Sequence, residues 1–149
     1  MSDLKTSIQE DTKTALKAGD KVRVGTLRLL SAAIKNREIE MGKEATDDDV
    51  RDVAIKEAKR RRESIEAYRS AGREELAGAE EAELEILKPF LPEQLSEVEL
   101  NALIDEAVAS TGATSPKEMG KVMGAVMAKA KGKADGTVVQ ELVRAKLGA

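Results

Sequence analysis

Glycines spaced by four and bordered by lysines are the residues of this 149-residue chain whose types and spacing point most clearly to a binding chemistry. Gly120, Gly124 and Ala128 share one face of a helix predicted between Ser115 and Gly132. Interior glycines cost a helix roughly 1 kcal/mol each relative to alanine, so something should compensate for them. Bare backbone allows close approach by another helix or by a sugar-phosphate backbone. The candidate RNA-binding residues are Lys117, Gly120, Lys121, Gly124, Ala128, Lys131 and Lys133.

The helix that carries this face is marked at both ends. Ser115 can cap it, with Pro116 at the first helical position and Glu118 completing a capping box, and Gly132 suits a left-handed residue after its last turn. Tight packing of two helices is the ordinary explanation of small residues at this spacing, and it stays open beside RNA binding. The residues expected to face inward are Met119, Val122, Met123, Val126 and Ala130, with Met127 on the flank.

Stretches in both halves of the chain resemble the GatB/YqeY family. MGKVMGAVM, followed by KGKADG and VVQELVRAKL, is similar to the C-terminal domain of that family, and KRRRESIEAYRSAGREELA is similar to its free-standing YqeY-like members. The resemblance covers nearly the whole chain. In the family, this helical domain forms the tail of the GatB subunit of the tRNA-dependent glutamyl/aspartyl amidotransferase and is associated with binding the tRNA body. The resemblance therefore implies tRNA or another folded RNA as a partner, with a tRNA-using enzyme as a further one.

Carbon–nitrogen ligase activity with glutamine as amido-N-donor would follow by inheritance from the same family, but the residues for catalysis are missing. The sequence has no histidine and no cysteine, which removes the usual nucleophilic triads and the usual zinc, iron and haem ligands. No P-loop occurs, and the catalytic part of GatB has no counterpart here. We expect no cofactor, no metal site and no catalysis by the chain alone. The favoured function is a tRNA-binding accessory protein, and the alternative is a helical protein–protein interaction module that uses the Gly120/Gly124 face.

Charge is distributed unevenly in a composition typical of globular proteins, with 41% hydrophobic and 36% charged residues. Residues 1–110 hold 18 Lys and Arg against 25 Asp and Glu, and residues 111–149 hold 7 against 3, which suits one localised RNA contact. With one Tyr and one Phe, an RNA would be recognised by its backbone and shape. No run of about 18 apolar residues and no charged-then-apolar leader is seen, so we expect no membrane partner and a cytoplasmic location.

Apolar periodicity predicts an all-α protein with an N-terminal helical bundle over residues 1–88, a linker over 89–95 and a small C-terminal three-helix domain over 96–149. Pro89 and Pro92 break the chain between the two parts. The N-terminal helices are expected over about 4–18, 21–41, 48–71 and 73–87, and the C-terminal ones begin near Ser96, Ser115 and Thr137.

Three further expectations concern single side chains of the N-terminal part. Leu76 should face inward from the fourth helix. Arg61 falls inside the apolar stripe of the third helix, so if it is buried it needs a carboxylate from the second or fourth helix. Asp47, Asp48 and Asp49 stand in the first turn of the third helix, where capping explains them better than a cation site.

Overall fold

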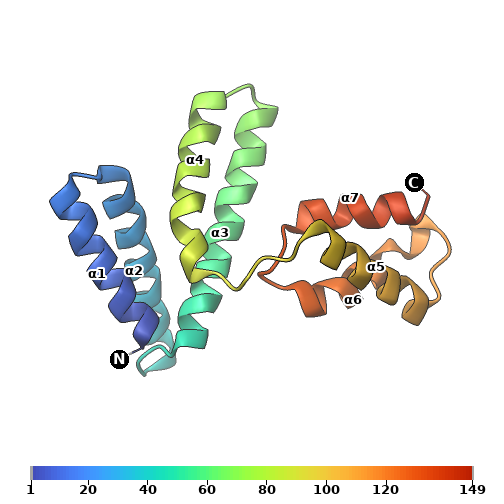
Figure 1. Ribbon diagram of the computed structural model, residues 1–149, viewed down its shortest axis with the longest axis horizontal. Helices are drawn as coiled ribbons and strands as arrows, with labels where there is room; N and C mark the ends of the chain where they lie inside the picture. Colours follow the sequence, from blue (N-terminus) through green and yellow to red (C-terminus); the bar gives the residue numbers. More distant parts are fainter. Residues whose placement is uncertain (1, 149) are drawn as a thin grey trace. The chain divides into compact units, whose positions relative to one another are not determined.

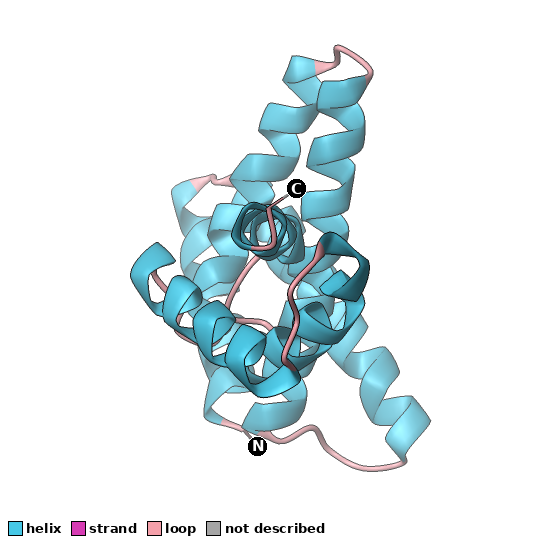
Figure 2. Ribbon diagram, turned by 90° about the vertical axis from the view of Figure 1, so that its right-hand side faces the viewer, coloured by secondary structure: helices cyan, strands magenta, loops and turns pink. Residues whose placement is uncertain are grey.

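The chain folds into helices joined by short loops. A computed structural model describes residues 2–148, and these form seven α-helices and two short 3-10 helices, with no strand among them (Figures 1 and 2). The predicted all-α class is therefore confirmed. The chain divides into two compact units, Met1–Leu91 and Pro92–Ala149. Whether each unit folds alone as a domain stays a prediction. None of the helices in the described residues is long and apolar enough to cross a membrane.

Four helices make up the first unit: α1 (Asp3–Ala18), α2 (Lys21–Met41), α3 (Asp47–Ser70) and α4 (Glu74–Leu87). α3 and α4 form an antiparallel hairpin, and α2 packs against α1, α3 and α4 (Figure 1). The helix ends follow local chemistry. Thr46 and Asp49 form a reciprocal capping box that begins α3, as predicted. Gly19 and Gly42 end α1 and α2 with φ values of 72° and 70°, a conformation that costs glycine little.

The core of the first unit is made by the facing sides of these helices and by the short helix η1 (Lys88–Phe90). The prediction for Leu76 was wrong, because this side chain is 41% exposed while its neighbour Ala77 is buried. Leu76 lies near the tip of the α3–α4 hairpin, which extends beyond α2, so only α3 covers α4 there (Figure 1). The buried residues of this core are Ile8, Leu27, Leu30, Ile34, Ala45, Val50, Val53, Ala54, Ala58, Ile86, Leu87, Phe90 and Leu91.

A carboxylate of α2 ties together three segments of the first unit. Glu38 Oε2 accepts hydrogen bonds from Lys5 Nζ of α1 at 2.7 Å and from the Ala45 amide of the α2–α3 loop at 2.8 Å. The bond from Lys5, followed by the bond from Ala45, lowers the pKa of Glu38 below its usual value. The ionised Glu38 therefore helps to hold α1 and the loop against α2.

Three helices make up most of the second unit: α5 (Glu97–Thr111), α6 (Met119–Ala130) and α7 (Gly136–Lys146). α6 packs against both α5 and α7, and the short helix η2 (Pro116–Glu118) precedes it. The segment before α5 is fixed to the turn after α6, because the Leu95 amide donates to the Lys133 carbonyl at 2.7 Å. The core residues of this unit are Leu100, Ile104, Ala107, Ala113, Val122, Val126, Ala130, Val139, Val143 and Leu147.

Candidate nucleic-acid interface

α6 is positioned by its apolar side and by a cap at its start. Val122, Val126 and Ala130 are buried in the core, and the three methionines of α6 are partly buried against it, as predicted. The start of the helical segment differs, because Pro116–Glu118 form the 3-10 helix η2 before α6 begins at Met119. Glu118 accepts hydrogen bonds from the Thr114 amide at 2.6 Å and the Ser115 amide at 3.3 Å. These bonds, the one from Thr114 first, lower the pKa of the Glu118 carboxyl.

The opposite side of α6 is uncovered within this chain. Gly120, Gly124 and Ala128, which we call the glycine face, are all exposed. A Cβ atom added to Gly120 or Gly124 would meet nothing within 4 Å apart from its own helix backbone. Packing of this face against another helix of the second unit is therefore ruled out for the described residues. The backbone along α6 is open to a partner molecule.

The four candidate lysines lie at the start, middle and end of this helical segment. Lys121 lies on α6 itself, Lys117 lies in η2, and Lys131 and Lys133 lie in the turn that follows α6. All four are exposed, and none of them forms an ion pair with another residue of the part of the chain described, 2–148. Their ammonium groups are therefore available to an external anion.

The turn after α6 has a defined geometry. Lys131 has φ −53° and ψ 121°, Gly132 has φ 74°, and the Lys133 amide donates to the Ala130 carbonyl at 2.8 Å. These values are typical of a type II turn, whose third residue must adopt a positive φ. The left-handed conformation predicted for Gly132 is confirmed. Because the turn is also held by Leu95 and by the Gln94 side chain, which donates to the Gly132 carbonyl at 2.8 Å, Lys131 and Lys133 stand on a fixed backbone.

Basic charge is confined to one part of the second unit. Residues 92–149 hold seven Lys and Arg against eight Asp and Glu, because the segment up to the end of α5 adds five carboxylates and no base to residues 111–149. Two bases are neutralised by α5: Lys129 pairs with Glu106 at 2.8 Å, and Lys146 pairs with Asp105. The candidate interface is therefore a local surface around α6 and not a property of the whole unit.

The basic run of α3, Lys59–Arg62, is organised differently. Arg61 is only 6% exposed, and its Nη1 donates to Glu57 Oε2 at 2.9 Å and to the Glu57 carbonyl at 3.1 Å. Glu83 of α4 lies 3.8 Å from Arg61 Nε, so the expected partner on the fourth helix is present, but the shorter contact is to Glu57 of the same helix. Arg60 also pairs with Glu57, at 3.4 Å. Two of the four bases of this run, Arg60 and Arg61, are therefore engaged within the α3–α4 hairpin.

One carboxylate of this cluster, Glu80 of α4, was not singled out from the sequence. Burial, followed by repulsion from Glu83, raises the pKa of Glu80, and the nearby Arg61 and Arg60 oppose this shift. The position of Glu80 on the side of α4 that faces Arg61 is the signal that a helical wheel could have provided.

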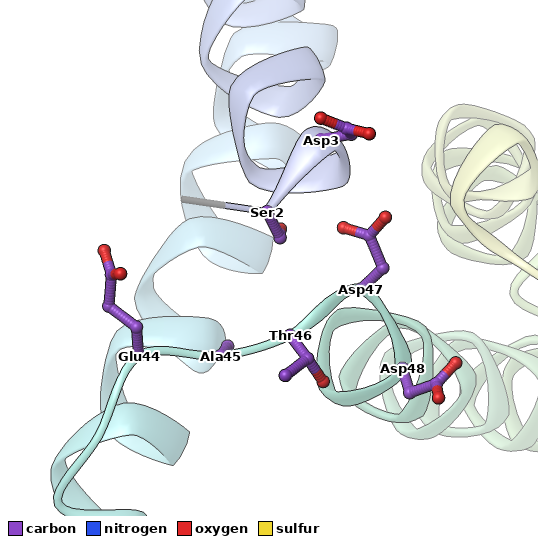
Figure 3. Close-up of a pocket in the computed structure, with 7 residues that line it drawn as sticks. All are labelled: Ser2, Asp3, Glu44, Ala45, Thr46, Asp47 and Asp48. Carbon is purple, nitrogen blue, oxygen red and sulfur yellow. The ribbon is translucent and has the colours of Figure 1, made fainter.

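A shallow hollow lies where the starts of α1 and α3 meet. It is lined by Ser2, Asp3 and residues 44–48 (Figure 3). Figure 3 shows the Asp47 and Asp48 side chains pointing in different directions. Asp47 accepts a hydrogen bond from the Leu4 amide at 3.1 Å, which lowers its pKa and engages it in joining α1 to α3. In residues 2–148, no group of three or more carboxylates is placed to hold a metal ion.

Comparison with known proteins gives one family and several relatives. The family model described as "Yqey-like protein" matches residues 5–147. A protein of Lachancea thermotolerans named "Altered inheritance of mitochondria protein 41, mitochondrial" is 32% identical over 113 residues, which cover 74% of this chain and 60% of that protein. The protein of the same name from Saccharomyces cerevisiae is 31% identical over 85 residues, covering 56% of this chain and 46% of that protein. An uncharacterized protein of Schizosaccharomyces pombe is 32% identical over 95 residues, covering 64% of this chain and 77% of that protein.

These relatives correct the predicted location, and they also show how much of their length the chain matches. The cytoplasmic location expected from the sequence is contradicted, because the named relatives are described as mitochondrial. The expectation rested on the lack of an apolar leader, which distinguishes secreted proteins but does not separate the cytoplasm from the inside of an organelle. The chain spans about half the length of the relatives named as mitochondrial, 60% of one and 46% of two others.

Proposed function

Because the chain belongs to the YqeY-like protein family, we propose that it is an accessory protein that binds tRNA or another folded RNA through α6. The observation that supports this proposal is the open glycine face, beside which Lys117, Lys121, Lys131 and Lys133 are free of ion pairs within residues 2–148. We place the contact in a C-terminal three-helix domain, 96–149, that folds separately from a helical domain over 1–88.

The physical basis of the proposed contact is close approach of a phosphate backbone. Glycine has no side chain, so phosphates can lie closer to the helix backbone at Gly120 and Gly124 than they could if any other residue type stood there. Lysines at the two ends of the helical segment supply positive charge, and each phosphate that they neutralise releases a counterion. With one Tyr and one Phe in the chain, stacking on bases contributes little, so shape and backbone dominate recognition.

Titration of tRNA at several salt concentrations tests the proposal. Replacing Lys121 and Lys131 with glutamine removes up to two phosphate contacts, so the variant should bind more weakly and its logarithmic salt slope should fall by roughly 0.7 to 0.9 per contact. A matched control replaces Lys59 and Arg62 of the α3 basic run with glutamine and should leave the slope unchanged. Undetectable binding by the wild type at low salt, or equal effects in both variants, would reject the proposal.

A helical partner protein on the glycine face is the second candidate function, favoured by the same open backbone. Gly124→Leu fills the face without disturbing the fold, since a Cβ atom there meets nothing within 4 Å. We expect this variant to lose tRNA binding and to melt no lower than the wild type, because leucine is a better helix former than glycine. If the partner is instead a protein helix, the wild type does not bind tRNA, and replacing the lysines has little effect on binding of that helix.

The ligase activity that family inheritance would imply is tested separately. The protein is incubated with glutamine, ATP, magnesium and misacylated tRNA, and we expect no amidated product.

A further inference from the structure

The outer face of α2 carries apolar and small side chains that nothing in the first unit covers. Val22, Leu29 and Ile39 are 54%, 55% and 68% exposed, although the other side of the same helix is buried in the core. The other positions in the same row, Gly25, Ala32 and Asn36, are small or uncharged. With the three apolar residues they form a row spaced alternately by three and four, which we call the α2 seam: Val22, Gly25, Leu29, Ala32, Asn36 and Ile39, all exposed.

The spacing of the α2 seam is the heptad spacing of helices that pack along their length. Residues spaced by three and four in turn follow a nearly straight line on a helix, and in a coiled coil such a line contacts the partner helix. Gly25 and Ala32 leave room for close approach, and a Cβ atom added to Gly25 would meet nothing within 4 Å. Asn36, a polar residue in the seam, is of the kind that selects register in such pairs.

A row of positive charge runs beside the seam. Lys21, Arg28 and Lys35 are spaced by seven, each immediately precedes a seam residue, and all three are exposed. None of the three forms an ion pair with another residue in the described range 2–148. In a coiled coil, side chains at this flanking position face the flanking residues of the partner helix and help to select it. The seam is therefore bordered on this side by three cations that form no ion pair within the described part of the chain, although Lys35, after the hydrogen bond from Lys5, also contributes to lowering the pKa of Glu38.

We propose that the α2 seam is a docking surface for an amphipathic helix of another protein that carries acidic residues beside its own apolar row. A second copy of this chain fits poorly, because two α2 helices paired antiparallel would bring their basic rows together. In a parallel pair, the basic row would face Thr26, Ala33 and Glu40, of which only Glu40 is acidic. A partner helix with glutamate or aspartate at the flanking positions satisfies both the apolar seam and the charges.

Other anionic partners match only part of the surface. A phosphate backbone would neutralise Lys21, Arg28 and Lys35 but would leave the apolar side chains of the seam without a partner. An anionic lipid surface would accept those side chains but would gain nothing from Gly25 and Ala32, since helices at lipid surfaces rely on large apolar residues. This surface lies on α2 and shares no residue with the α6 interface. A result that rejects one of the two proposals therefore leaves the other unaffected.

The test uses the full-length chain and a labelled synthetic helical peptide of about three heptads, with leucine and alanine in its apolar row and glutamate at its flanking positions. A second peptide has lysine at the flanking positions. Fluorescence anisotropy should show that the wild type binds the glutamate peptide at least about tenfold more tightly than the lysine peptide. Absence of binding to the glutamate peptide, or equal binding to both peptides, would overturn the proposal.

Variants separate the seam from its charges. Leu29→Lys should weaken binding of the glutamate peptide about tenfold, and Arg28→Glu combined with Lys35→Glu should reverse the preference between the two peptides. The control, Lys13→Glu combined with Lys17→Glu, makes the same charge change on the exposed side of α1 and should change binding less than about twofold. Circular dichroism melts should be the same for all variants because each position is exposed.

Three further outcomes would each overturn the proposed occupant. An equal loss of binding in the α1 control would show attraction to net charge alone. A wild-type dimer in velocity sedimentation that Leu29→Lys dissociates would identify a second copy as the occupant. Binding to vesicles of anionic lipid that Leu29→Lys abolishes would identify a membrane surface. If the glutamate peptide binds as expected and Leu29→Lys leaves tRNA titrations unchanged, the seam is a second and separate interface.

Discussion

The α3 basic run and the glycine face of α6 are both surfaces with clustered positive residues, and they differ in where that charge is directed. In α3, Arg60 and Arg61 pair with Glu57, and Arg61 is buried beneath α4. On α6, Lys121 is exposed and forms no ion pair with a residue of the described chain, and the backbone beside it is bare. Two bases of the denser run are therefore engaged within the fold, while Lys121 of α6 is free for a partner. Charge density along a sequence does not by itself indicate a binding surface.

Of the substitutions that test this comparison, Arg61→Ala should have the largest effect, a loss of unfolding free energy. It removes the cation that lies between Glu57 of α3 and Glu83 of α4, and the two carboxylates are left in a partly buried site. Breaking a buried ion pair in this way costs about 3 kcal/mol of unfolding free energy or more. Urea denaturation measures the loss. The control is Lys59→Ala, an exposed position of the same run, which should change stability by less than about 0.5 kcal/mol. Equal effects would mean that Arg61 is not a structural residue.

Much of the difference between the α3 basic run and the glycine face follows from patterns in the sequence. The bounds of α2 agree with those predicted, because an aspartate cap and a glycine stop flank a regular apolar row. From the place of Arg61 in the apolar stripe, a carboxylate partner was predicted if that side chain is buried, and a contact with the fourth helix was one of two options. The Glu57 contact was not predicted, since a partner on the same helix depends on side-chain rotamers that periodicity does not contain. The exposure of Leu76 was missed because the pattern does not reveal how far the hairpin extends beyond α2.

The candidate site was predictable in its parts but not in its arrangement. Helical spacing alone placed the glycines on one face, and the structure confirms that the face is exposed. Whether another helix covers those glycines depends on how α5, α6 and α7 pack, which no local pattern specifies. The position of Lys131 and Lys133 in a turn follows from the end of α6 at Ala130 and from hydrogen bonds to residues far earlier in the chain.

Glu80→Gln should have a smaller effect on stability, and the size of that effect should depend on pH. The folded-state pKa of Glu80 is raised by burial and by Glu83, so the ionised form is disfavoured by folding. At pH 7 the ionised Glu80 therefore lowers stability, and this cost disappears as the pH falls through the raised pKa and then below the usual value for a glutamate, about 4.3. The variant should be slightly more stable than the wild type at pH 7 and equal to it at low pH. Urea midpoints across this range check the sign, and a variant that is less stable at pH 7 would contradict it.

The most direct test of the proposed RNA contact is an amide map of the protein by 15N-resolved NMR during titration with tRNA. Gly120 and Gly124 have bare, exposed backbone, so their amide signals should shift or broaden first, together with those of Lys121 and of the turn at Lys131. The amides of the α3 basic run should stay unchanged at the same tRNA concentrations, because two of its four bases are already paired with Glu57. Perturbations centred on α3, or spread over the chain with no preference for α6, would contradict the account.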